Sequence, residues 1–371
     1  MLSLFLTKPF CYADTTEPKS TAIFYASQPP VELLGQYQRV VVEPDNITAQ
    51  ELAALHAKGA KVFAYLSIGE VNSTRKWYKQ VDPDWILGRN NVWDSEVMDL
   101  ANPGWQNFVI KQLVAPLADK GYDGLFLDTM DSFHIYATNQ AARDRQAQAL
   151  ASLLQTIRKT YPNIHLIANR GFEVMSTVAP QLEAVAAESL FASWDNARKT
   201  FRTVKLEDTK WLMEKLTSLK RDYGLDIIVI DYLPIAHRED ARTLAKKIQD
   251  LGFVPWVTKP ELDGMGVGLI EPKPQEALVV FDSKLQGQQP LNLPMYQQLQ
   301  DTLQKQGLQV KMHDIQLGVP REVVVGRYAS IYMGIPEEQQ TAASKAWFKS
   351  RQAEGITAVV VNKEKFDEPT Q

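Results

Sequence analysis

Residues 121–131 read Gly-Tyr-Asp-Gly-Leu-Phe-Leu-Asp-Thr-Met-Asp, and this stretch decides the fold. Its short apolar run ends at Asp128, and a second carboxylate, Asp131, follows three residues later. A run of Leu and Phe this short is typical of a strand that is buried on both faces, as in a parallel sheet. In α/β proteins the carboxyl ends of such strands carry the chemistry. The alternative is that Asp128 only caps the helix that follows.

Seven other segments have the same apolar character, and helical segments separate most of them. The expected strands are residues 21–25, 39–43, 61–67, 124–128, 164–169, 184–188, 226–231 and 253–257. This alternation over residues 20–262 predicts an α/β fold, a (β/α)8 TIM barrel. An open doubly wound sheet is the competing topology, but no Gly-rich phosphate loop follows the first strand to favour it.

Several helix boundaries can also be read from the sequence. Thr48 and Glu51 have the spacing of a capping box, which predicts a helix from there to about Lys58. Pro103 follows Asn102 at the expected first position of another helix. Further helices are expected over residues 139–160, after Gly171, over 207–223 and up to 250. Residues 73–96 lack periodicity but contain three tryptophans, which is typical of a loop that covers a site.

The sequence changes in character after the expected barrel. Residues 263–275 include Glu-Pro-Lys-Pro-Gln and are predicted to be a linker. Residues 276–371 again alternate strands and helices, which predicts a small parallel α/β module that continues in a longer parent protein or has been trimmed. This module has no acid pair, phosphate loop or histidine cluster, so we expect it to pack or to bind a partner.

Composition excludes several classes of function. The chain has 371 residues and a net charge of −4, so no excess of basic residues favours nucleic-acid binding. Residues 1–13 resemble the end of a secretory signal, although a disordered N-terminus is the alternative. The single cysteine, Cys11, lies in that segment, so the mature chain is expected to have neither disulfides nor thiolate metal sites. No other apolar run is long enough to span a membrane, and a periplasmic or secreted location is expected.

In a barrel, the carboxyl ends of all strands face one mouth. The residues expected there are Tyr25, Glu43, Tyr65, Glu70, Asp128, Asp131, Asn169, Glu188, Asp231, Tyr232 and Trp256. This rim is rich in acids and aromatic rings but poor in histidine, and no histidine pair has metal-ligand spacing. We therefore expect no metal and no cofactor. A Gly-x-Ser-x-Gly elbow is also absent, which disfavours serine hydrolysis.

Two carboxylates without a metal are the equipment of a glycoside hydrolase. Asp128 and Glu188 form the best pair, because they end strands two β/α units apart and alternate barrel strands point inward at one level. The alternative for Glu188 is a buried acid that is bound to a backbone amide. Substrate contacts are expected from the other rim residues, although the polar ones could instead cap helices. These expected substrate-binding residues are Tyr25, Tyr65, Glu70, Asp131, Asn169, Asp231, Tyr232 and Trp256.

Three motifs resemble those of TIM-barrel glycoside hydrolases of family 114 and the related family 166, and most closely the hydrolase domains of Pel exopolysaccharide proteins. They are Tyr65-Leu-Ser-Ile-Gly-Glu70, Gly124-Leu-Phe-Leu-Asp-Thr-Met-Asp131 and Ala187-Glu188-Ser189. Phe24-Tyr25 with Pro29-Pro30, and Val40-Val-Val-Glu-Pro44, are similar as well.

The resemblance implies an endo-acting α-1,4-galactosaminidase or N-acetylgalactosaminidase that cleaves a partly deacetylated, cationic polymer. Asp128 would be the nucleophile and Glu188 the general acid/base. Two other functions stay open. One is a non-catalytic polysaccharide-binding or scaffold protein of an export complex, and the other is a glycosidase that acts on another α-linked sugar.

Overall fold

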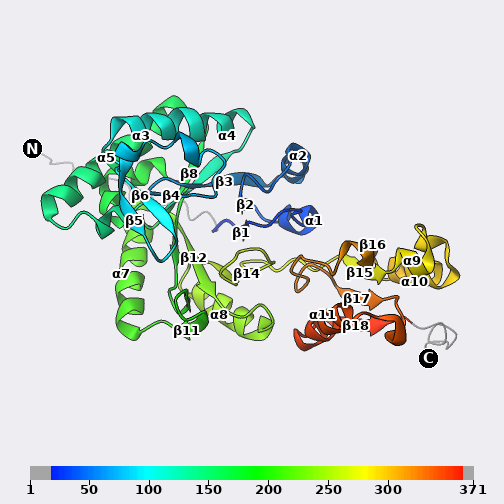
Figure 1. Cartoon of the computed structure of the whole chain (residues 1–371). Helices are drawn as coiled ribbons and strands as arrows, with labels where there is room; N and C mark the ends of the chain where they lie inside the picture. The colour runs from blue at the N-terminus through cyan, green and yellow to red at the C-terminus, as the bar shows by residue number, and fades with distance from the viewer. Residues whose placement is uncertain (1–17, 362–371) are drawn as a thin grey trace, which may run out of the picture.

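Eight parallel strands form the barrel that the sequence predicts, and the computed structural model describes residues 18–361 of the chain (Figure 1). They are β1 (Thr21–Phe24), β2 (Arg39–Val42), β3 (Lys61–Ser67), β7 (Gly124–Asp128), β8 (His165–Asn169), β9 (Ala184–Glu188), β12 (Asp226–Tyr232) and β13 (Val254–Thr258). The strands are neighbours in this order, and a short antiparallel strand, β14 (Val267–Gly268), follows β13. The amide of Tyr25, just after β1, donates to the carbonyl of Leu262, in the loop after β13, at 2.7 Å, which links the first and last parallel strands. The signal-like segment 1–13 lies outside the described residues.

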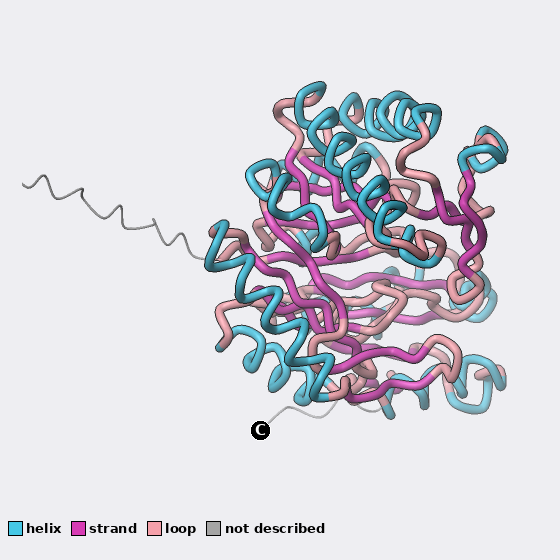
Figure 2. Tube along the Cα trace, turned by 90° about the vertical axis from the view of Figure 1, so that its left-hand side faces the viewer, coloured by secondary structure: helices cyan, strands magenta, loops and turns pink. Residues whose placement is uncertain are grey.

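Helices lie outside the strands (Figure 2). They are α1 (Val31–Leu34), α2 (Ala49–Ala57), α3 (Pro103–Phe108), α4 (Ala115–Asp119), α5 (Gln140–Thr160), α6 (Met175–Val178), α7 (Leu206–Tyr223) and α8 (Arg238–Asp250). The predicted capping box is present, because the Thr48 side chain accepts the Glu51 amide and the Glu51 carboxylate accepts the Thr48 amide. The helix expected after Gly171 is reduced to α6. Pro180 lies just beyond it and has no N–H with which to continue an α-helix.

The aromatic loop that follows β3 forms a small antiparallel sheet. Its strands are β4 (Glu70–Asn72), β5 (Ile86–Asn90) and β6 (Ser95–Met98), in the order β4-β6-β5. Trp77 and Trp85 are partly buried and pack on the core against Trp105 and Phe108 of α3. Trp93, at the turn between β5 and β6, stays 59% exposed.

The chain then forms the predicted parallel module, which lies beside the barrel in Figure 1. Its sheet has the order β16-β15-β17-β18. The elements are β15 (Glu276–Phe281), α9 (Ser283–Gln286), α10 (Pro294–Lys305), β16 (Gln309–Asp314), β17 (Ser330–Met333), α11 (Ala342–Ala353) and β18 (Thr357–Val360). The last helix begins at Ala342, because the side chain of Thr341 caps it by accepting the amide of Ser344.

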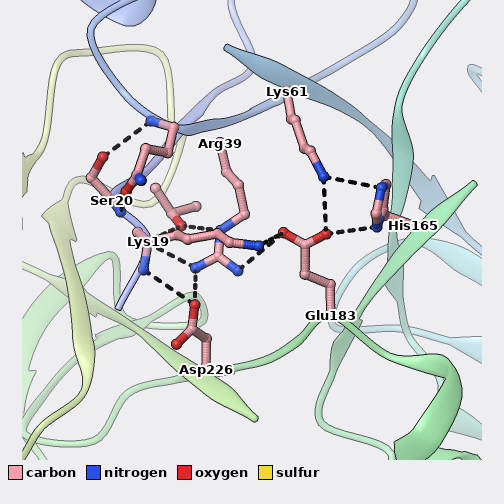
Figure 3. Close-up of polar contacts among 9 residues, drawn as sticks. Lys19, Ser20, Arg39, Lys61, His165, Glu183 and Asp226 are labelled. Carbon is pink, nitrogen blue, oxygen red and sulfur yellow. Dashed lines mark hydrogen bonds and ion pairs between the residues drawn. The ribbon is translucent and has the colours of Figure 1, made fainter. Parts of the chain in front are cut away.

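A buried ionic network closes the N-terminal end of the barrel (Figure 3). Arg39 is fully buried and donates to Asp226 Oδ2 at 2.9 Å and to the Lys19 carbonyl at 2.8 Å. Glu183 Oε1 lies 3.7 Å from the Arg39 guanidinium, and its Oε2 lies 2.7 Å from His165 Nδ1. The network therefore links β2, β8, the segment before β9, and β12, at the end opposite the predicted active site.

Candidate active site

Three neighbouring strands end in polar side chains at the mouth of the barrel. β7 ends at Asp128, β8 at Asn169 and β9 at Glu188. The sheet places β8 between the other two strands, so Asn169 lies between the two acids.

Asn169 connects the two carboxylates directly. Its Nδ2 donates to Asp128 Oδ1 at 2.8 Å and to Glu188 Oε1 at 2.9 Å. Because both oxygens accept hydrogen bonds of these lengths from the same nitrogen, Asp128 Oδ1 and Glu188 Oε1 lie less than about 6 Å apart. Carboxyl groups separated by roughly 5–5.5 Å are typical of retaining glycosidases, and those of inverting enzymes lie roughly 6.5–9.5 Å apart.

Each acid also accepts a hydrogen bond from a tyrosine on the neighbouring strand of the sheet. Tyr65, on β3, donates to Asp128 Oδ2 at 2.7 Å, and Tyr232, on β12, donates to Glu188 Oε2 at 2.6 Å. Tyr25, which follows β1, packs on Tyr65 with the ring centroids 5.0 Å apart. The structure thus brings together the predicted pair and four of the residues that were expected to bind substrate.

The two acids differ in their surroundings. Burial, and next to it the negative charge of Asp128, raises the pKa of Glu188, although the bonds from Tyr232 and Asn169 oppose the rise. Glu188 is therefore biased towards its protonated form. Asp128 instead accepts two hydrogen bonds, one from the hydroxyl of Tyr65 and one from the amide of Asn169. Two acids held in different environments are the basis for dividing acid and nucleophile roles between them.

The backbone is strained immediately after each of the three polar residues. Thr129, Arg170 and Ser189 have φ angles of 60°, 59° and 63°. Non-glycine residues rarely adopt this left-handed conformation, and such residues cluster at functional sites. The same strained turn thus follows Asp128, Asn169 and Glu188 on adjacent strands.

Two arginines that were not among the predicted substrate contacts lie around the pair. Arg75, from the loop after β4, binds both oxygens of Glu43 at 2.8 and 3.0 Å and lies 5.7 Å from the ring centroid of Tyr65. Arg170 donates to the Glu188 carbonyl at 3.1 Å. The sequence offered one signal for Arg75, because it lies in a loop expected to cover the site and Glu43 needed a partner.

Asp131 lies near this group and is partly buried. Burial raises its pKa, and the charge of Arg170 opposes that rise. Its role as a substrate contact stays a prediction.

Three predicted substrate contacts are engaged elsewhere. Asp231 is fully buried, and its carboxylate accepts the backbone amides of residues 190, 191 and 192 at 2.6, 2.9 and 3.1 Å. Burial raises its pKa to about 6. Trp256 is also fully buried, with its ring edge-on to Tyr37 at 5.7 Å. Glu70 is 5% exposed and accepts hydrogen bonds from Asn90 and Ser95. This geometry does not support a direct substrate contact for these three side chains.

Comparison with known proteins places the barrel in a family. The model of glycoside-hydrolase family GH114 matches residues 8–270. The chain belongs to glycoside-hydrolase family GH114. The resemblance predicted from the three motifs is thereby confirmed, and the GH114 chain is a glycosidase by family.

Solved structures agree with this assignment. The glycoside hydrolase domain of PelA from Pseudomonas aeruginosa is 39% identical to the GH114 chain, with a TM-score of 0.63; the match covers 67% of this chain and 98% of that one. Ega3 from Aspergillus fumigatus, solved with galactosamine, is 12% identical, with a TM-score of 0.52 and coverage of 72% and 100%, and shows the fold alone. An uncharacterized protein of Thermotoga maritima is 23% identical over 272 residues, which cover 67% of this chain and 80% of that protein.

Two further features concern residues 18–361 of the GH114 chain only. In this part, His, Cys, Asp and Glu side chains do not gather in any group of three that could hold a metal ion. None of its helices combines the length and the apolar character that a membrane span requires.

Proposed function

We propose that the chain is an endo-acting, retaining glycosidase that cleaves α-1,4-linked polymers of N-acetylgalactosamine and galactosamine, that is, partly deacetylated ones. The observation that carries this proposal is the pair of carboxylates bridged by one amide nitrogen at 2.8 and 2.9 Å. The substrate class follows from the family resemblance and from the similarity to the PelA hydrolase domain. We also propose a periplasmic or secreted location, where such a polymer is accessible, and export machinery as the partner of the module.

The mechanism assigns one role to each acid. The Asp128 carboxylate attacks the anomeric carbon, and the glycosidic C–O bond breaks while Glu188 gives its proton to the departing oxygen. A covalent glycosyl–enzyme intermediate results. Glu188, now ionised, removes a proton from water, the water oxygen attacks the same carbon, and Asp128 leaves as a carboxylate. The raised pKa of Glu188 supports its assignment as the acid.

The stereochemistry of the product tests this proposal. Two successive inversions at one carbon should release the α-anomer first from an α-linked galactosamine oligomer. Proton NMR of the fresh reaction, before mutarotation, measures the anomer that appears first. If the β-anomer appears first, retention is wrong. If wild-type protein binds the oligomer but leaves its length unchanged, the protein is a polysaccharide-binding protein rather than a hydrolase.

The tyrosine on Glu188 should control the alkaline side of the pH profile. Tyr232→Phe removes a hydrogen bond that stabilises ionised Glu188, so the pKa of that carboxyl rises further. Because Glu188 must be protonated to act as the acid, the alkaline limb of kcat/KM should move to higher pH by about one unit or more. Tyr65→Phe is the matched control, because it removes a bond to Asp128 only and should leave that limb in place. A profile of Tyr232→Phe with the wild-type alkaline limb contradicts the assignment.

A further inference from the structure

The turn between β5 and β6 carries an exposed apolar tip that the catalytic pair does not use. Val92 is 61% exposed and Trp93 is 59% exposed. The other two tryptophans of the same loop pack into the core against α3. Exposed aromatic rings at the edge of a site mark binding surfaces more often than isolated surface residues do.

The tip is hydrogen-bonded to the hairpin that follows β9. The Nδ2 of Asn196 donates to the Val92 carbonyl at 2.9 Å. Asn196 lies in the turn between β10 (Ala192–Asp195) and β11 (Thr200–Thr203), a hairpin that begins four residues after Glu188. The β5–β6 hairpin follows β3, and the β10–β11 hairpin follows β9. Because the tips of these two hairpins are hydrogen-bonded to each other, together they form an arch between the ends of β3 and β9. In sheet order, the strands between these two are β7 and β8, which carry Asp128 and Asn169.

The base of the first hairpin is also fixed in place. The hydroxyl of Tyr136 donates to the Arg89 carbonyl at 2.9 Å and accepts the Arg89 amide at 2.7 Å. The Tyr136 ring lies so close to Gly88 that a Cβ there would come within 2.1 Å of it. Arg89 also pairs with Glu96, on the partner strand, at 2.8 Å. These contacts fix the backbone of the hairpin that carries Trp93, so its backbone loses little freedom when a ligand binds.

We infer that Trp93 is a stacking platform for pyranose rings of the polysaccharide, at a subsite distant from the bond that is cleaved. The inference rests on the proposed function. Strand β10 rises roughly 10 Å from its first residue to its last. Asn196, which holds the tip, follows the last residue of β10, so the tip contacts this hairpin at the end away from Glu188. A pyranose presents a C–H face that packs on a flat apolar ring, and the arch is continuous with the strands that carry the catalytic pair.

The test compares Trp93→Ala with Trp211→Ala. Trp211, on α7, is the matched control, because it is also a largely exposed tryptophan, at 48%, and packs edge-on to Phe172. Kinetics are measured on galactosamine oligomers of increasing length. Trp93→Ala should raise KM for the long oligomers roughly two- to tenfold at similar kcat, and the rise should shrink as the oligomer is shortened. Trp93→Phe should recover part of the loss, because it restores a ring.

The dependence of KM on oligomer length distinguishes failure of the platform from failure of the proposed function. A KM for Trp93→Ala that equals the wild-type value at every length overturns the inference. An equal rise at every length also overturns it, because the arch has then disturbed the catalytic pair itself. If wild-type protein cleaves no galactosamine oligomer, the proposed function fails, and binding of uncleaved oligomers by the two tryptophan variants, measured by affinity electrophoresis, still decides whether Trp93 forms a sugar platform.

Discussion

Replacing either acid of the pair by alanine should nearly abolish turnover of galactosamine oligomers. For Glu188→Ala we expect a loss of roughly 10²–10⁴-fold, the usual contribution of a general acid, and for Asp128→Ala a loss at least as large, because no covalent intermediate can form. Turnover is measured by the reducing ends released, with folding checked by the thermal unfolding midpoint. Glu173→Gln is the matched control, because this carboxylate binds His134 and not the catalytic pair.

Azide separates the two roles. On a galactosaminide with an activated aryl leaving group, azide can take the place of the missing carboxylate. In Asp128→Ala it attacks the substrate once, from the face opposite the leaving group, and gives the β-azide. In Glu188→Ala it attacks the covalent intermediate and gives the α-azide. If Asp128→Ala gives the α-azide and Glu188→Ala gives the β-azide, the two roles are the reverse of those proposed. Full activity in either variant would falsify the acid-pair mechanism.

The sequence predicted the barrel because each of its strands is a short, nearly continuous apolar run, and burial on both faces requires that composition. It predicted Asp128 and Glu188 because a charged residue at the end of such a run must find either a functional role or a specific partner. Asn169 was expected to bind substrate, and its bridge between the acids depends on β8 lying between β7 and β9, which sheet order decides and local sequence does not.

The geometry of a strand explains why Asp231 does not lie where the sequence predicted it. Asp231 and Tyr232 are neighbours on β12, and successive side chains of a strand point to opposite faces. The hydroxyl of Tyr232 reaches Glu188, so Asp231 points the other way, where it binds the backbone of residues 190–192. The sequence indicates where a strand ends, but it does not indicate which of the last two side chains faces the catalytic pair. Arg75 reaches Tyr65 from a loop with no regular period, so its position depended on tertiary packing.

A second large effect is expected at the other end of the barrel, on stability rather than turnover. Arg39→Met should lower the free energy of unfolding by about 3–5 kcal/mol, because it leaves Asp226 without its buried cation, whereas Glu183 keeps Lys19 at 3.0 Å. The unfolding midpoint should fall by roughly 10 °C, measured by calorimetry. Arg221→Met is the matched control, since Arg221 pairs with Asp222 on the surface, and it should leave the midpoint unchanged.

A double variant tests whether the unpaired carboxylate of Asp226 causes the loss of stability in Arg39→Met. The double variant Arg39→Met with Asp226→Asn should recover part of the lost stability, because a neutral amide costs less to bury than an unpaired carboxylate. Each folded variant should keep the wild-type kcat, since the network lies at the N-terminal ends of the strands and the catalytic acids lie at their carboxyl ends. If Arg39→Met unfolds at the wild-type midpoint, the buried guanidinium does not hold the barrel closed, and the hydrogen bond from Tyr25 to Leu262 becomes the stronger candidate for that role.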